Sequence, residues 1–192
     1  MFRTKISNHL PRLLACLVVA SSLVACSKPH ADEPAPANGT IALTDVKPGM
    51  SDKILKDANF SFVLDPNPQA SKNGGSQFLS RELDSKGGRY MVHCTNGICF
   101  MVQVLYEAKA IDKTQALETL KAVMPADAPP LAKTDMHKSD KEPVEIYEYG
   151  DRYGGALTYA DKSAARIKMV TGSIFKPNEL GQWFHVAGPK AK

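Results

Sequence analysis

Two cysteines five positions apart are the residues whose types and spacing most directly suggest chemistry. Cys94 and Cys99 enclose the sequence Thr95-Asn96-Gly97-Ile98, and Asn-Gly favours the two positive φ angles of a type I′ hairpin turn. If Thr95 and Ile98 flank that turn, the cysteines form the next pair outward, with both side chains on one face. Their separation then suits a disulfide. We therefore predict a Cys94–Cys99 disulfide that fixes the register of the hairpin.

A metal or redox site is the alternative at this hairpin. Met91, His93 and Met101 lie close to the cysteines in the sequence, and soft sulfur ligands select copper. In a regular strand pairing, however, Met101 would share the face of the two cysteines, whereas Met91 and His93 would point to the other face. The cysteine spacing is also wider than that of common redox or zinc pairs. We therefore expect no metal and no cofactor.

The rest of the chain has no arrangement typical of catalysis. The sequence contains no G-x-S-x-G, H-E-x-x-H, P-loop or G-x-G-x-x-G motif. On a strand, Glu145 and Glu148 would face opposite sides, so they cannot form a carboxylate pair. We predict that the protein is not an enzyme, with an unrecognised catalytic site as the alternative. The histidines that follow the N-terminal segment are scattered along the chain: His30, His93, His137 and His185.

Four tyrosines are the candidate partner-binding residues: Tyr147, Tyr149, Tyr153 and Tyr159. Alternate positions on neighbouring strands could gather these rings on one sheet face. Exposed aromatic rings of this kind bind proteins or sugars. Packing of the same rings against a helix is the alternative, and Trp183 and Phe184 could cover the same sheet.

Two helices and six strands would position these residues. Ser51 is a candidate N-cap for a short helix. Asp112 and Gln115 form a capping-box pattern before a second helix, which Pro125 ends. Polar loops over 65–75 and 126–143 separate each helix from its strands. The predicted strands cover 77–83, 89–95, 98–106, 144–149, 155–160 and 165–171.

This order of elements predicts an α+β fold. Helices grouped before antiparallel meanders, rather than alternating with single strands, are typical of that class. Each helix would cover one face of its meander. The order occurs over 41–110 and again over 111–187, so two tandem α-βββ units are a further hypothesis.

The beginning of the chain resembles a secretory signal peptide. Arg3, Lys5 and Arg12 precede an apolar run over 13–20, which is short for a transmembrane helix. Leu23-Val24-Ala25-Cys26 resembles the lipobox of bacterial lipoproteins. This resemblance implies that residues 1–25 are removed and that Cys26 is acylated, for instance by palmitate, and anchored in the bilayer. A plain signal peptide and an uncleaved membrane anchor are the alternatives.

Residues after the lipobox refine this expectation. Ser27 rather than Asp follows the cysteine, which in enterobacterial lipoproteins implies the outer membrane at its periplasmic face, with the inner membrane as the alternative. Residues 26–40 hold the lipidated cysteine and a proline-bearing tether with few apolar residues. Residues 188–192 are expected to form a disordered tail.

Charge argues against nucleic acid as a partner. Three cations would leave with the signal peptide, so the net charge falls from +4 to +1. A nearly neutral mature chain lacks the basic surface that binds phosphate backbones. The expected partners are the lipid bilayer, through Cys26, and an envelope protein.

A family resemblance supports a binding role. Val46, Gly49, Met50 and Ser51 before a short helix, with a meander behind a lipobox and tether, resemble the SmpA/OmlA-type lipoproteins of outer-membrane assembly. The tandem arrangement resembles the β-lactamase inhibitor proteins. Both families are binding proteins without catalytic centres. The resemblance implies a membrane-anchored periplasmic lipoprotein that binds a protein partner or supports the envelope, with a small-ligand or inhibitor module as the alternative.

Overall fold

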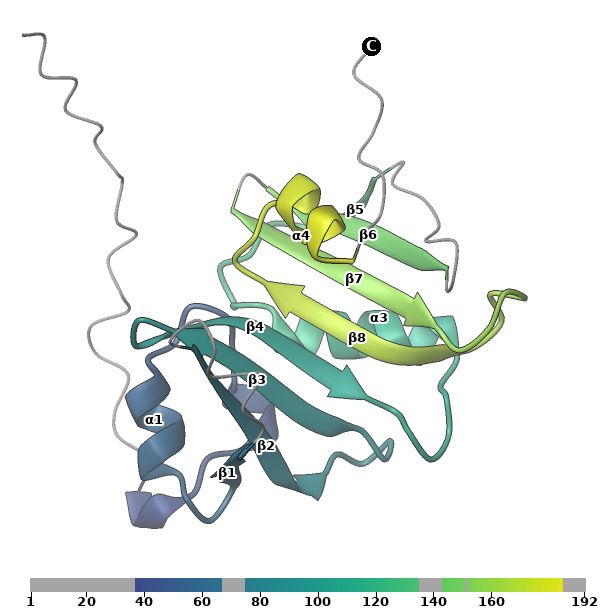
Figure 1. Cartoon of the computed structure of the whole chain (residues 1–192). Helices are drawn as coiled ribbons and strands as arrows, with labels where there is room; N and C mark the ends of the chain where they lie inside the picture. Colours follow the sequence, from purple (N-terminus) through teal and green to yellow (C-terminus); the bar gives the residue numbers. More distant parts are fainter. Residues whose placement is uncertain (1–36, 67–74, 135–142, 151, 185–192) are drawn as a thin grey trace, which may run out of the picture.

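Eight antiparallel strands form one sheet in the order β1-β2-β3-β4-β8-β7-β6-β5. The computed structural model describes residues 37–66, 75–134, 143–150 and 152–184. Helices lie on both sides of the sheet, with α3 behind it and α4 in front in Figure 1. The fold is therefore α+β and antiparallel, as the sequence predicts. The predicted signal peptide, Cys26, most of the predicted tether and the predicted tail lie outside the described residues.

Two halves of the chain meet at the centre of this sheet, where β4 pairs with β8. One core contains residues from both halves. The first half contains η1 (Ala37–Gly39), η2 (Leu43–Asp45), α1 (Asp52–Asp57), β1 (Phe62–Leu64), β2 (Gly75–Leu83), β3 (Arg89–Thr95) and β4 (Ile98–Leu105). The second contains α3 (Lys113–Val123), β5 (Ala132–Lys133), β6 (Val144–Tyr149), β7 (Tyr153–Tyr159), β8 (Ile167–Ser173) and α4 (Pro177–Trp183).

Both predicted helices form, and their caps are as expected. Ser51 Oγ accepts a hydrogen bond of 3.3 Å from the Lys53 amide at the start of α1. Asp112 Oδ1 accepts from the Gln115 amide at 2.9 Å, and Gln115 Oε1 accepts from the Asp112 amide at 3.3 Å. These bonds satisfy amide groups that a helix N-terminus otherwise leaves without partners.

Three elements differ from the predictions. β1 precedes the loop predicted at 65–75, and β5 lies inside the loop predicted at 126–143. α4 forms where no helix was expected, with Pro177 in its first turn, a position that suits proline. The folded part also begins before residue 41, because Gly39 O accepts a hydrogen bond from the Phe60 amide.

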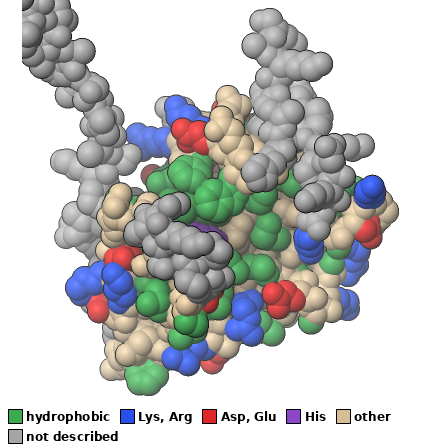
Figure 2. Space-filling model, viewed as in Figure 1, with side chains coloured by type: hydrophobic (Ala, Val, Ile, Leu, Met, Phe, Trp, Pro, Cys, Tyr) green, Lys and Arg blue, Asp and Glu red, His purple; other side chains and the backbone are tan. Residues whose placement is uncertain are grey.

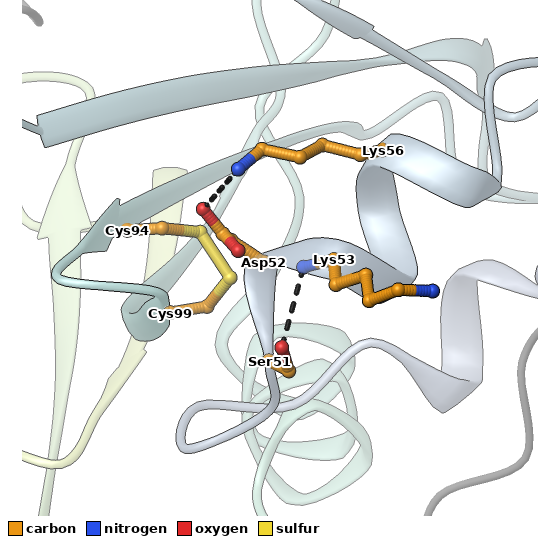
Figure 3. The surroundings of a disulfide bond; sticks show 6 residues. All are labelled: Ser51, Asp52, Lys53, Lys56, Cys94 and Cys99. Carbon is orange, nitrogen blue, oxygen red and sulfur yellow. Dashed lines mark hydrogen bonds and ion pairs between the residues drawn. A yellow bond between two sulfur atoms is a disulfide. The ribbon is translucent and has the colours of Figure 1, made fainter.

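The predicted disulfide hairpin is present. Asn96 and Gly97 have φ angles of 51° and 81°, Thr95 pairs with Ile98, and Cys94 is bonded to Cys99. Figure 3 shows the disulfide beside the first turn of α1, where Lys56 Nζ lies 2.7 Å from Asp52 Oδ2.

The segment before α1 pairs with this hairpin. The Gly49 amide donates to Cys99 O at 2.7 Å, the Cys99 amide donates to Met50 O at 2.9 Å, and the Asp52 amide donates to Gly97 O at 2.9 Å. The disulfide is therefore buried under the entry to α1.

A β-bulge next to the disulfide changes the predicted faces. Cys94 pairs with Cys99, but His93 pairs with Met101, so Phe100 is an extra residue in β4. Met101 therefore lies on the face of His93 and Met91. The expectation that Met101 shares the face of the cysteines is wrong, because it assumed a regular pairing.

The two faces of the sheet are covered differently. α1 and α3 pack on one face, called the core face, together with residues such as Phe78, Val92, Val102 and Leu157. The other face, called the α4 face, carries His93, Met101, Gln103, Thr171 and Ile146. α4 lies over β6 and β7. Among the described residues, no helix covers β2 and β3 on this face.

Candidate functional site

The α4 face is the candidate site, and the strand register builds it. Met91, Gln103 and Thr171 are direct neighbours across β3, β4 and β8. His93 and Met101 form the adjacent pair. Alternate residues of each strand point to one face, so these five side chains share one surface. Figure 2 views this face and shows hydrophobic side chains gathered on it.

A glycine lets α4 approach the sheet closely. Leu180 of α4 is buried against Ile146, Ala156 and Met101. A Cβ at Gly154 would lie 2.5 Å from Phe175 O and 3.1 Å from Leu180 Cδ2. Any larger residue at this position would therefore displace the segment that leads into α4.

Four rings form an aromatic cluster beside α4: His93, Phe100, Phe175 and Trp183. The Phe100 and Phe175 ring centroids lie 5.2 Å apart, and the Trp183 ring stands edge-on to His93 at 6.1 Å. These separations suit favourable aromatic pairs. Trp183 is 47% exposed, so the cluster presents the indole ring to solvent, while the other three rings are partly buried.

Neutral polar groups lie next to the aromatic cluster. His93 Nε2 lies 2.9 Å from Gln103 Oε1, and Gln103 is buried. Burial lowers the pKa of His93, while the Gln103 hydrogen bond and the Asp65 carboxylate act against the shift. The imidazole is therefore neutral at pH 7, and Gln103 holds one of its nitrogens.

Two threonine hydroxyls on the α4 face are buried without a hydrogen-bond partner. Thr171 lies directly opposite Gln103, and Thr158 pairs with Met169. Among the described residues, their Oγ1 atoms have no hydrogen-bond partner. Unsatisfied buried polar groups are costly, and both hydroxyls lie in the interior, where they are closed off from solvent.

The four predicted tyrosines do not form an exposed binding face. Tyr147, Tyr149 and Tyr159 are buried in the core against α3, and Tyr153 is half-buried at its edge. Alternation gathers the first three on one face as expected, but a helix covers that face. Trp183 lies on the opposite side of the sheet, so it does not cover the tyrosines.

Glu145 forms ion pairs with two lysines beside the buried tyrosines. Glu145 Oε1 lies 3.0 Å from Lys133 Nζ, its Oε2 lies 2.8 Å from Lys113 Nζ, and the Tyr147 hydroxyl donates to Oε2 at 2.7 Å. Partial burial opposes ionisation, but these hydrogen bonds together lower the pKa of Glu145 to about 2. Glu145 is thus a permanent carboxylate that joins α3 to β5 and β6.

A separate cavity of about 430 Å³ lies between the entry to α1 and the end of α3. Its lining combines apolar Pro48, Met50, Pro125 and Ala126 with charged Asp45, Lys47 and Asp127. This composition suits a shallow apolar contact rather than acid–base chemistry.

Gln103 and Phe100 are site residues that the sequence patterns did not predict. Gln103 is the one strongly polar residue in the apolar run of β4, which was a usable signal because a lone buried amide needs a partner. Phe100 reaches the α4 face through the bulge, which has no clear signature in the sequence.

Comparison with known proteins gives no match: no family model, curated protein or solved structure matches this chain. Within the described ranges, no three or more His, Cys, Asp or Glu side chains are grouped to hold a metal ion. None of the helices in those ranges is long and apolar enough to span a bilayer.

Proposed function

We propose that this protein is a lipid-anchored lipoprotein of the cell envelope that binds a protein partner through its α4 face. The observation that carries the proposal is the composition of that face. An exposed tryptophan and two phenylalanines lie beside a neutral His93–Gln103 pair. Aromatic anchors next to a few buried polar groups are typical of interface hot spots.

A non-enzymatic role agrees with the chemistry of this face. His93 is paired with the amide of Gln103, which holds the ring but cannot relay a proton as a carboxylate would. Catalytic triads need a nucleophile and a base oriented by a third group. The lipobox-like Leu23-Val24-Ala25-Cys26 supports the envelope location, and acylation of Cys26 would hold the protein at the bilayer.

We also infer that the two halves of the chain are tandem units. Each half has one helix on the core face before a four-stranded meander, and their last strands, β4 and β8, pair at the centre of the sheet. The support is this common order of elements. The units are α-ββββ rather than the α-βββ of the sequence analysis, because β1 and β5 extend each meander.

Affinity capture with surface variants tests the partner-binding proposal. The mature protein is captured from solubilised envelopes, and each bound protein is quantified by mass spectrometry. We expect Trp183→Ala and Met91→Glu to lower the recovery of one partner about tenfold or more. Lys121→Glu, on the exposed side of α3, should leave recovery unchanged. Thermal melting confirms that each variant is folded, and equal recovery with all three would contradict the proposal.

A further inference from the structure

We propose that the β1 edge of the sheet is a bilayer-contact surface that seats the folded domain on the membrane. This surface, called the β1 edge patch, consists of Phe60, Val63, Leu64 and Leu83. Their side chains are 70%, 41%, 55% and 50% exposed. Among the described residues these four and Trp183 are the exposed large hydrophobics, so four of the five gather at one edge.

The geometry of β1 makes this edge apolar on both sides. Val63 and Leu64 are consecutive in the strand, so they point to opposite faces. β1 is the first strand in the sheet order, and within the described part of the chain it pairs with β2 alone. Edge strands of soluble proteins are normally protected by charged residues, whereas β1 has the sequence Phe-Val-Leu.

The path of the chain indicates that the membrane is the surface that contacts this patch. The Phe60 amide donates to Gly39 O at 2.9 Å, and the Ile41 amide donates to Ser61 Oγ at 2.9 Å. The chain therefore enters the folded domain beside Phe60. Figure 1 shows η1, α1 and β1 at one end of the molecule, with β5 and α4 at the other.

The lipidation site is close to that point of entry. Cys26 precedes Gly39 by 13 residues, which span roughly 43 Å even when fully extended at about 3.3 Å per residue. An acyl anchor on Cys26 thus keeps the β1 edge patch at high effective concentration near the bilayer. This step rests on the proposed function, because it requires the anchor.

Charges near the patch favour apolar contact over electrostatic attraction. Lys53 is ion-paired with Asp57, and Lys56 with Asp52. Arg81 Nε donates to Asn59 O at 3.0 Å. Cations and carboxylates are thus mixed at this edge, so apolar contact with the headgroup–acyl boundary carries the binding. The domain would contact the membrane through the β1 edge of its sheet, and the α4 face would remain accessible to a protein partner.

Quenching by brominated lipids tests the proposal without relying on acylation in the cell. A chain of residues 26–192 has Cys26 as its one free thiol when Cys94 and Cys99 are bonded. A maleimide lipid coupled to Cys26 anchors it in phosphatidylethanolamine–phosphatidylglycerol vesicles. Trp183→Phe removes the single native tryptophan. Phe60→Trp then places one probe at the patch, and Lys121→Trp places it instead on the exposed side of α3.

We expect lipids brominated near the headgroup to halve the emission of the Phe60→Trp protein and to leave that of the Lys121→Trp protein unchanged. Adding Val63→Ser and Leu64→Ser should restore the emission at position 60. Equal quenching at both positions, or none at either, would overturn the proposal. The emission of the Phe60→Trp protein could instead shift to the blue without quenching, by an amount that grows with the density of protein on the vesicle. That result would show that the edge contacts a second copy of the chain, and it would also overturn the proposal.

Acylation of Cys26 is tested separately, by measuring the intact mass of the protein extracted from its own membranes. An unmodified Cys26 there would contradict the lipoprotein proposal, while the coupled protein still reports on the patch.

Discussion

At the scale of single residues, His93 links the stability of the α4 face to pH. Its pKa is lowered in the folded state, chiefly by burial, so the unfolded chain binds a proton more readily below about pH 6.5. Stability from this group is therefore fully present at neutral pH and is lost as pH falls from about 6.5 through the folded-state pKa.

Replacement of His93 should remove this dependence. We expect His93→Gln to show a smaller fall in melting temperature than the wild type between pH 7.5 and 5. Calorimetry across this range measures the difference. Parallel curves for the two proteins would show that His93 is not buried as the structure places it.

The second titrating residue is Glu145, whose pKa is lowered to about 2 although partial burial opposes the shift. Its stabilising contribution is present above the ordinary carboxyl pKa of about 4.3 and is lost as pH falls toward 2. Because Lys113 and Lys133 are about half exposed, Glu145→Gln should cost only about 1 kcal/mol at pH 7. Urea unfolding at pH 7 and pH 2.5 checks this, and an equal cost at both values would contradict it.

At the scale of elements, the disulfide hairpin was predictable because its signal is local. Asn96-Gly97 determines the turn, and the turn determines that Cys94 faces Cys99. The bulge at Phe100, directly after Cys99, depends on how β4 fits between β3 and β8. The face of Met101 therefore does not follow from the turn alone.

Removal of the disulfide tests the role of that hairpin. Cys94→Ala with Cys99→Ala should lower the free energy of unfolding by about 2 kcal/mol, since the loop it closes is short. The chain should still fold, because the Gly49 and Met50 hydrogen bonds to Cys99 use backbone groups. Denaturant unfolding and circular dichroism measure both, and a molten double variant would contradict this view.

The helix α4 was missed because its stability depends on packing rather than on local sequence. Gly154 provides the space for that packing, since a Cβ there would meet Phe175 O. Gly154→Ala should cost about 1–3 kcal/mol and change the Trp183 emission spectrum. The exposed Gln182→Ala serves as the control, with little expected change. A native spectrum in Gly154→Ala would show that α4 does not pack on β7.

At the scale of the whole molecule, the fold class followed from the sequence, but the proposed binding face did not. Helices before meanders predicted an antiparallel α+β fold, and the strands over 89–95 and 144–149 have the predicted bounds. The sequence could not show which sheet face remains accessible. That depends on α3 covering the tyrosines and on α4 covering one half of the other face, which are tertiary contacts.

The short strands β1 and β5 were also not predictable from the sequence, because they too depend on tertiary contacts. Three and two residues are too few for an alternating pattern to be recognised. Both form because an adjacent strand, β2 or β6, offers backbone groups to pair with.

The α4 face is proposed to bind a protein partner in the envelope. Photo-crosslinking in living cells tests this claim most directly, with a benzophenone amino acid placed at position 183 or, as the control, at position 121. We predict a discrete adduct at position 183 that competes with unlabelled wild-type protein, and none at position 121. Adducts at both positions, or at position 121 alone, would contradict the claim.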